Sequence, residues 1–195
     1  DPSSAFIQGN YIKLDGIQGE STLNGYQGAI EANSFSWGLS RPVTGRTSIG
    51  RAVTDNLVWQ DLRFVSDVSA ASPQLLQNLS TARRSANVTL NTVVSSPTGA
   101  SPVSLLKLEL SDVLVSSLHQ QGVNGTTPVE EAGLNFQKIR VTRASFQNDG
   151  ALTTRSTAIS NNAGGKLATY SPGSSLLQET PTTGSESQTY LKFAG

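Results

Sequence analysis

The chain has 195 residues, of which 36% are hydrophobic and only 14% charged, and its 14 basic side chains balance its 14 acidic ones. This length is typical of one domain. A formal net charge of zero provides no basic field for a phosphate backbone, so nucleic acid is not expected as a main partner. Cysteine is absent, which excludes disulfides and thiolate chemistry. No apolar run approaches the roughly 20 residues of a membrane helix, so no membrane insertion is expected.

The polar surface is expected to come from Ser, Thr, Asn, Gln and Gly rather than from charge, a composition common in extracellular β-proteins. The chain also contains no methionine, not even at position 1. Removal of a signal peptide and removal of a tag both explain this start. We therefore expect a secreted or extracellular protein, with its export route left open.

Short runs in which apolar and polar residues alternate dominate the chain, and such runs predict β-strands with one packed face. Between residues 33 and 40, for example, Phe35, Trp37 and Leu39 alternate with serine and glycine. The expected strands occupy residues 11–16, 33–40, 56–68, 86–94, 105–118 and 133–146. The chain is therefore expected to be a mainly antiparallel β-protein.

One segment has helical rather than strand spacing. Ser72 is expected to be the N-cap, and Pro73 takes the first helical position, where its missing N–H is harmless. Three leucines then follow as an apolar stripe. The segment predicts a short helix from Pro73 to Ala82 that packs against the sheet.

Two segments are expected to be long irregular loops. Residues 41–56 combine one proline, two glycines and three arginines, and residues 148–187 are rich in Gly, Ser, Thr and Asn. Loops of this length in a compact domain are usually functional or disordered. Residues 189–195 are strand-like again, so the C-terminus is expected to return to the sheet.

Two of the expected strands change the face on which their apolar residues lie. Leucines alternate with polar residues between positions 106 and 111, whereas Val113, Leu114 and Val115 are apolar on both faces. Residues 133–146 contain a second change of phase. Bends are needed to close a sheet, so these changes favour a small barrel or a tightly curved sandwich.

No arrangement of residues points to catalysis. His119 is the single histidine, which excludes a metal site of several imidazoles, and no G-x-S-x-G motif is present for a serine triad. Gly165-Lys166 lacks the other residues of a phosphate loop. The adjacent Glu130 and Glu131 point to opposite faces of a strand. We expect no catalytic residues, no cofactor and no metal, and only the scattered aspartates leave a glycosidase pair open.

Five stretches of the chain carry a resemblance to a known family. They are IKLDGIQGEST at 12–22, IEANSFSWGLS at 30–40, ASPQLLQNLSTA at 71–82, LKLELSDVLVSS at 106–117 and PVEEAGLNFQKIRVT at 128–142. In this order they resemble the haemolysin-coregulated protein family, Hcp, the tube protein of the bacterial type VI secretion system. The resemblance covers residues 10–146 of a single expected domain, 1–195. Residues 1–9 are an N-terminal extension and residues 147–195 a polar C-terminal one.

The resemblance implies a small antiparallel β-barrel, like those of phage tail tubes, with one short flanking α-helix. It also implies that six copies form a ring and that rings stack into a hollow tube. Small effector proteins in the lumen, and sheath and spike proteins, are the further partners it implies. A standard tube subunit assembles in the cytoplasm, whereas an extracellular filament would need a signal peptide for export.

Four apolar residues are expected to contact a neighbouring subunit in the ring: Val113, Val115, Phe35 and Trp37. For the two valines, burial under the helix or under the polar tail is the alternative. Each such side chain, once buried, contributes about 1.5–3 kcal/mol.

Charged residues are expected at two further surfaces. The arginine-rich loop corresponds to the family's extended loop, which reaches the adjacent ring, so Arg41, Arg46 and Arg51 are expected to contact that ring. Lys107 and Glu109, on the polar face of their strand, are expected to face the lumen.

Three kinds of function follow from these observations. The first is an exported inner-tube component of a type VI secretion system, and the second is a secreted Hcp-like protein that forms extracellular tubes or filaments. The third, a secreted carbohydrate-binding β-sandwich, is disfavoured because only 6% of the residues are aromatic. An enzyme is the least favoured function.

Overall fold

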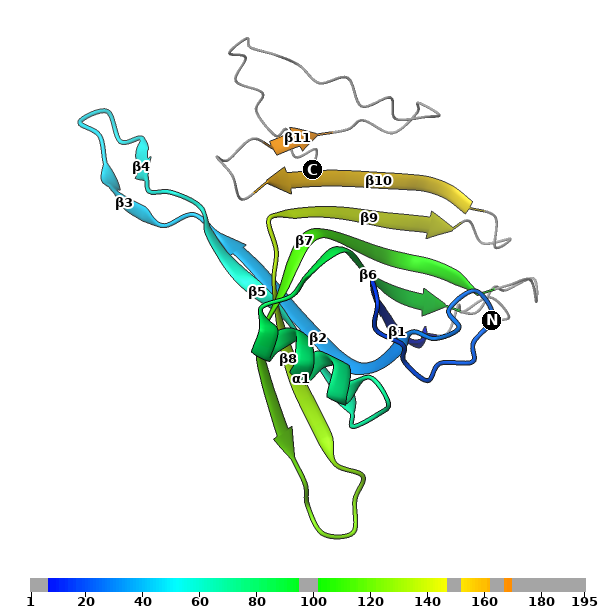
Figure 1. Ribbon diagram of the computed structural model, residues 1–195. Helices are drawn as coiled ribbons and strands as arrows, with labels where there is room; N and C mark the ends of the chain where they lie inside the picture. Colours follow the sequence, from blue (N-terminus) through cyan, green and yellow to red (C-terminus); the bar gives the residue numbers. More distant parts are fainter. Residues whose placement is uncertain (1–6, 95–101, 147–151, 162–166, 170–195) are drawn as a thin grey trace.

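A computed structural model describes residues 7–94, 102–146, 152–161 and 167–169 (Figure 1). Most of these residues lie in strands. The elements are β1 (Ile7–Leu14), β2 (Ile30–Ser40), β3 (Val43–Arg46), β4 (Ala52–Thr54), β5 (Val58–Asp67), α1 (Ser72–Thr81), β6 (Arg84–Val94), β7 (Val103–Gln121), β8 (Val129–Asn135), β9 (Lys138–Phe146), β10 (Leu152–Asn161) and β11 (Leu167–Thr169). The predicted fold class, mainly β with one short helix, is confirmed.

Six strands close into a ring. The sheet runs in the order β11-β10-β9-β7-β6-β1-β2-β5-β8, and β8 pairs again with β7. The ring is therefore β7-β6-β1-β2-β5-β8, and every pairing in it is antiparallel. Strands β9, β10 and β11 continue from β7 as a wing outside the ring (Figure 1).

Strand β7 closes the ring by changing partner along one of its edges. Its first half, Leu106–Ser111, pairs with β9, and its second half, Leu114–Gln121, pairs with β8. Asp112, between the two halves, has a φ of 53°. A left-handed residue inside a strand bends it, so the wing and the barrel diverge at this point.

The bend also explains the change of apolar phase. Leu108 and Leu110 are buried before it, and Val113 and Val115 are buried after it. The left-handed residue reverses the alternation, so both halves of the strand turn their apolar side chains toward one core. The second change of phase has a different cause, because β8 ends at Asn135 and β9 begins at Lys138, so the strand expected at 133–146 is two separate strands.

The prediction that Val113 and Val115 contact a neighbouring subunit is wrong. Their side chains are only 1% and 2% exposed in the single chain. They belong to the same core cluster as Leu75 of α1, and α1 packs against β7. The alternative, burial within the chain beside the helix, is what the structure shows.

Apolar side chains from all six strands fill the barrel. Phe64, Leu62, Leu90 and Leu108 are fully buried at its centre. Burying a side chain of this size contributes about 1.5–3 kcal/mol. The barrel therefore has its own core and does not depend on a partner for it.

Helix α1 is attached to the barrel by a buried carboxylate. Glu130 of β8 is 0% exposed and accepts a hydrogen bond from the Ser72 hydroxyl (2.8 Å) and another from the Gln120 amide (3.0 Å). The predicted N-cap is therefore wrong by one residue, since the cap is Ala71 and Ser72 donates into the barrel. A carboxylate at a helix N-terminus is also favoured by the helix dipole.

The predicted apolar stripe of α1 is only partly buried. Leu75 is fully buried, whereas Leu76 is 56% exposed on the outer side of the helix. The helix ends at Ala82, which has a φ of 52° and stops the helical hydrogen bonding. Within the described residues, no helix has the length and apolar character needed to span a bilayer.

Both segments expected to be irregular contain strands. Residues 41–56 include β3 and β4, and residues 148–187 include β10 and β11. The expected return of residues 189–195 to the sheet lies outside the described residues, as do residues 1–6 of the expected N-terminal extension 1–9. Residues 7–9 of that extension belong to β1, which pairs with β6.

The left-handed conformation of Asp112 leads to a first prediction. We expect Asp112→Val to lower the free energy of unfolding by about 1–3 kcal/mol, because a β-branched residue is strained at positive φ. Asp112→Gly relieves that strain and loses only an exposed ion pair with Arg84, so its change should stay within about 1 kcal/mol. Urea denaturation measures both, and a valine variant as stable as the glycine variant contradicts the account.

The burial of Val115 leads to a second prediction. Val115→Asp places a carboxylate in the core, so we expect a loss of more than about 4 kcal/mol and no folded protein. Val123→Asp is the matched control, because Val123 is 58% exposed and its replacement should change stability by less than about 0.5 kcal/mol. Thermal melting followed by circular dichroism distinguishes the two, and a folded, monomeric Val115→Asp variant would restore the interface interpretation.

Candidate assembly surfaces

A two-stranded hairpin projects from the barrel (Figure 1). It consists of β3 and β4, which form a separate sheet, and every residue of both strands is exposed. The hairpin is carried by the far end of β2 and the start of β5, where Ser40 pairs with Val58. Two of the long strands of the barrel thus continue beyond it as a ribbon that ends in the hairpin.

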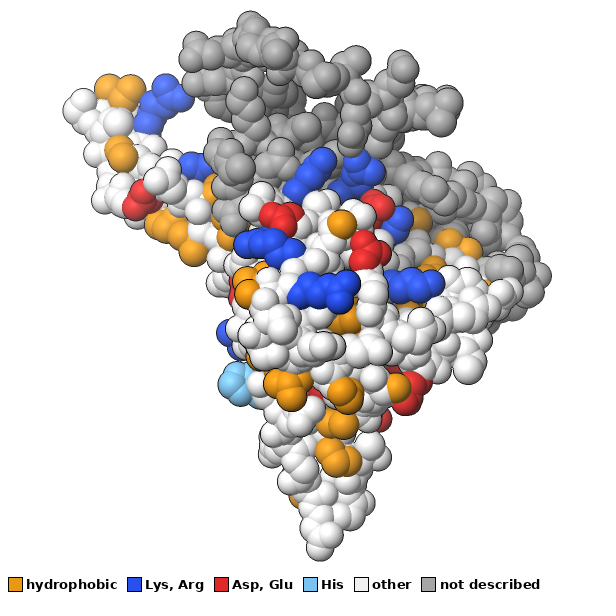
Figure 2. Space-filling model, in the orientation of Figure 1, with side chains coloured by type: hydrophobic (Ala, Val, Ile, Leu, Met, Phe, Trp, Pro, Cys, Tyr) orange, Lys and Arg blue, Asp and Glu red, His pale blue; other side chains and the backbone are white. Residues whose placement is uncertain are grey.

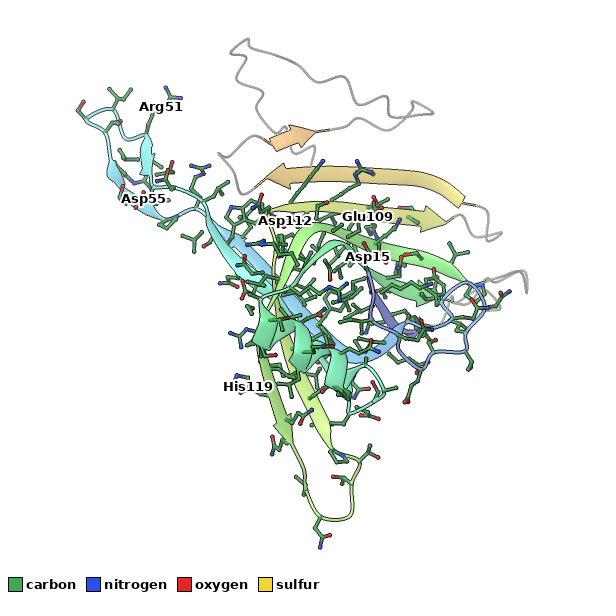
Figure 3. All side chains as sticks on the ribbon, in the orientation of Figure 1. Asp15, Arg51, Asp55, Glu109, Asp112 and His119 are labelled. Carbon is green, nitrogen blue, oxygen red and sulfur yellow. The ribbon has the colours of Figure 1, made fainter. Side chains whose placement is uncertain are left out.

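The three predicted arginines all lie exposed in this hairpin region. The Arg41 guanidinium donates to the carbonyl oxygen of Asp55 (3.0 Å), and that of Arg46 donates to the carbonyl oxygen of Gly50 (2.9 Å). Arg51 and Asp55 lie on the same side of the molecule, far from the barrel (Figure 3). Arg41 and Arg46 therefore stabilise the hairpin itself, and a contact of the arginines with another ring stays a prediction.

Exposed apolar side chains on the hairpin and on Val58 at its base were not predicted from the sequence. The exposed fractions are 77% for Ile49, 63% for Val43, 47% for Val58 and 42% for Val53. An isolated two-stranded hairpin is at best marginally stable in water. The only available signal was the presence of Val43, Ile49 and Val53, which are four to six residues apart and do not alternate, in a segment otherwise rich in turn-forming residues.

Half-buried aromatic residues lie at the base of the ribbon. Phe35 and Trp37 of β2 pack against the barrel core and keep part of their surface exposed. Trp59 of β5 contacts Phe136 edge-to-face, with ring centroids 5.7 Å apart. Phe35 and Trp37 thus contribute to the core, and their contact with a neighbouring subunit stays a prediction.

Polar and charged side chains occupy the outer face of β1, β6, β7 and β9, which we call the charged face. The strand register aligns Lys13, Thr89, Glu109 and Arg140 in one row across it. Lys107 lies one row along, and its ammonium group is 2.8 Å from a Glu109 carboxylate oxygen. Lys107 and Glu109 therefore point away from the core as expected, and their position in a lumen stays a prediction.

His119 lies on a different part of the surface. It is exposed on β7, opposite Glu131 of β8, and Glu131 forms an ion pair with Arg63 (2.9 Å). Among the described residues, no three His, Cys, Asp or Glu side chains are close enough to hold a metal ion.

Two tyrosines fix the loop between β1 and β2 to the outside of the barrel. The rings of Tyr11 and Tyr26 are 5.3 Å apart. Burial raises the pKa of the Tyr11 phenol above its ordinary value of 10.0, and the Glu31 carboxylate adds to this rise. Burial likewise raises the pKa of Tyr26, against a smaller opposing effect of a hydrogen bond with Ser104. Both phenols therefore stay protonated at neutral pH and act as packing groups.

Solved structures share this fold. A structure described as a type six secretion system protein superimposes with a TM-score of 0.75 at 20% identity, covering 82% of this chain and 99% of that chain. Hcp1 from Salmonella typhimurium superimposes with a TM-score of 0.65 at 21% identity, covering 84% of this chain and 100% of that chain. A type VI secretion system effector from Yersinia pestis superimposes with a TM-score of 0.60 at 22% identity, covering 78% of this chain and 98% of that chain. No curated protein matches the chain in sequence.

A family model matches the part of the chain that carries the barrel. The family is described as "Type VI secretion system effector, Hcp", and the match covers residues 11–142. These residues include all six strands of the ring except the first few residues of β1. The resemblance predicted from five sequence stretches is confirmed, and the chain belongs to the Hcp family of the type VI secretion system.

Proposed function

We propose that the chain is a structural subunit whose copies close into rings of six and stack into a hollow tube. The tube is the exported inner tube of a type VI secretion system. Membership of the Hcp family supports this function. The observation that carries it is the hairpin β3–β4, which exposes Val43, Ile49 and Val53 and has no core of its own.

The hairpin is the contact between successive rings. Each of its large apolar side chains contributes about 1.5–3 kcal/mol when a neighbouring copy covers it. Arg46 and Arg51 add polar contacts, since a guanidinium carries five N–H donors and the hairpin backbone uses only some of them. Glu20 and Glu31, both exposed, are the carboxylates of this chain that fit as their partners on the next ring.

The lateral contact within a ring uses the exposed parts of Phe35 and Trp37. A ring needs a heterologous contact, in which two different patches of the same chain meet. Half-buried aromatic residues are suitable for one side of such a contact, because they add area without unfolding the protomer. The two buried valines of β7 have no part in it.

The charged face is directed to the lumen in this arrangement, with Lys107 and Glu109 on it. Small effector proteins are the passengers of such a tube, and sheath and spike proteins are its outer partners. The subunit is carried out of the cell with the tube. This role depends on shape and surface and needs no reacting group.

Deletion of the hairpin tests the contact between rings. The ends of the hairpin are close, because the Asp55 N–H donates to the carbonyl oxygen of Pro42 (2.9 Å). Replacing residues 44–54 by two glycines should therefore leave the barrel folded with an unchanged melting temperature. We expect single rings and no stacked tubes in negative-stain images, and tubes of unchanged length would refute the proposed contact.

A single substitution tests the same contact more gently. Ile49→Asp should weaken ring stacking by at least about tenfold, because it removes apolar burial and places a charge in the contact. The control is Val123→Asp, which makes a similar change on the exposed β7–β8 turn. Sedimentation velocity over a concentration series compares the two, and equal effects of both substitutions would show that the hairpin has no special role.

A further inference from the structure

We propose that the charged face is a basic docking surface for acidic segments of passenger proteins. This inference rests on the proposed tube, because it names the chemistry of the passenger that the lumen accepts. It follows from an imbalance of charge on one face of a chain whose formal net charge is zero.

Among the residues that the structure describes, positive side chains outnumber negative ones on this face. Its six cations are Lys13, Arg83, Arg84, Lys107, Lys138 and Arg140. Its three carboxylates are Asp15, Glu109 and Asp112. Figure 2 shows the Lys and Arg side chains gathered across the side turned to the viewer, and Figure 3 labels the three carboxylates on that side.

The strand register shows why these residues share a face. Lys13 lies between buried Ile12 and Leu14, so it points away from the core. Lys138 is opposite Ser111 of β7, in the row next to that of Glu109 and Arg140. At the edge, the Arg83 guanidinium lies beside Gly16 in the turn after β1.

Each carboxylate of the face already has a partner within the chain. Glu109 interacts with Lys107 at 2.8 Å and with Arg140 at 3.9 Å, and Asp112 interacts with Arg84 at 3.1 Å. A carboxylate oxygen of Asp15 accepts the backbone N–H of Asn87 (3.1 Å). The described side chains of the face, six cations and three carboxylates, thus carry a formal excess of three positive charges, which attracts anions.

The neutral residues between the charges suit a peptide. Thr89 and Ser111 of the face carry hydroxyl groups, which hydrogen-bond to an extended chain. Lys13 and Arg140 are three strand spacings apart, about 14–15 Å, which is the length of roughly four extended residues. An acidic stretch of that length reaches cations at both sides of the face.

A protein segment fits this face better than a nucleic acid does. A phosphate backbone carries a charge at every nucleotide, so it meets the three carboxylates as well as the cations. Acidic side chains on a peptide are spaced irregularly and are flexible, so they can avoid the three carboxylates of the face. Each contact between exposed charges is weak. Repetition of the face around a ring increases the total binding of one passenger. Weak individual contacts also allow the passenger to be released later.

Fluorescence anisotropy of a labelled poly-glutamate peptide of about ten residues tests the inference on the full chain. We expect binding that weakens as salt rises, and Lys13→Glu should reduce the affinity about fivefold. Arg63→Glu makes the same change of net charge on the outside of β5, away from the face, and should leave binding unchanged. Absence of salt-dependent binding, or equal losses in both variants, would overturn the proposal.

A second probe and an assembly measurement separate the alternatives. Single-stranded DNA of the same length that binds as tightly as the peptide would identify the face as a nucleic-acid surface and overturn the proposal. Sedimentation of the same samples reports on the tube independently. Assembly without peptide binding refutes only the passenger chemistry, and peptide binding without assembly supports the face and refutes the tube.

Discussion

The architecture depends on one strand having two partners along the same edge. β7 pairs first with β9 and then with β8, and Asp112 makes the change possible by adopting a left-handed conformation. Because β8 also pairs with β5, this change closes the ring and encloses the core. Without it the sheet would stay open, with no closed interior for the apolar side chains. The wing, the ribbon and the hairpin lie outside the closed ring.

The residues that form the core of the protomer are different from the residues that remain exposed for contacts with other chains. The central side chains, Phe64 and its neighbours, are completely buried within one protomer. The hairpin, which exposes Val43, Ile49 and Val53, projects away from the barrel (Figure 1), and Val68, Leu76 and Val123 are exposed on other parts of the described chain. A partner that covers the hairpin therefore adds stability to the assembly without any rearrangement of the barrel. The charged face, on another side, remains available for weaker contacts.

Much of the fold could be predicted from the sequence, because alternation and helical spacing are local properties. The strands near 33–40 and 86–94 and the helix near 73–82 were found in this way. The roles of Val113 and Val115 could not be predicted from the sequence, since a bend in the strand and a second apolar face both produce consecutive apolar residues. The burial of both valines in the single chain and the left-handed φ of Asp112 decide between them. Residues 41–56 were expected to be an irregular loop and instead contain the β3–β4 hairpin, because its short strands lie among glycines and threonines that favour turns.

Whether protomers associate into rings and tubes is tested most directly by the size distribution of the intact protein in solution. Analytical ultracentrifugation from low to high concentration, with electron micrographs of the same samples, records whether protomers associate and what shape they form. We expect a ring-sized species and, at higher concentration, longer hollow particles of constant width. A single species with the mass of one chain at every concentration and ionic strength would contradict this expectation.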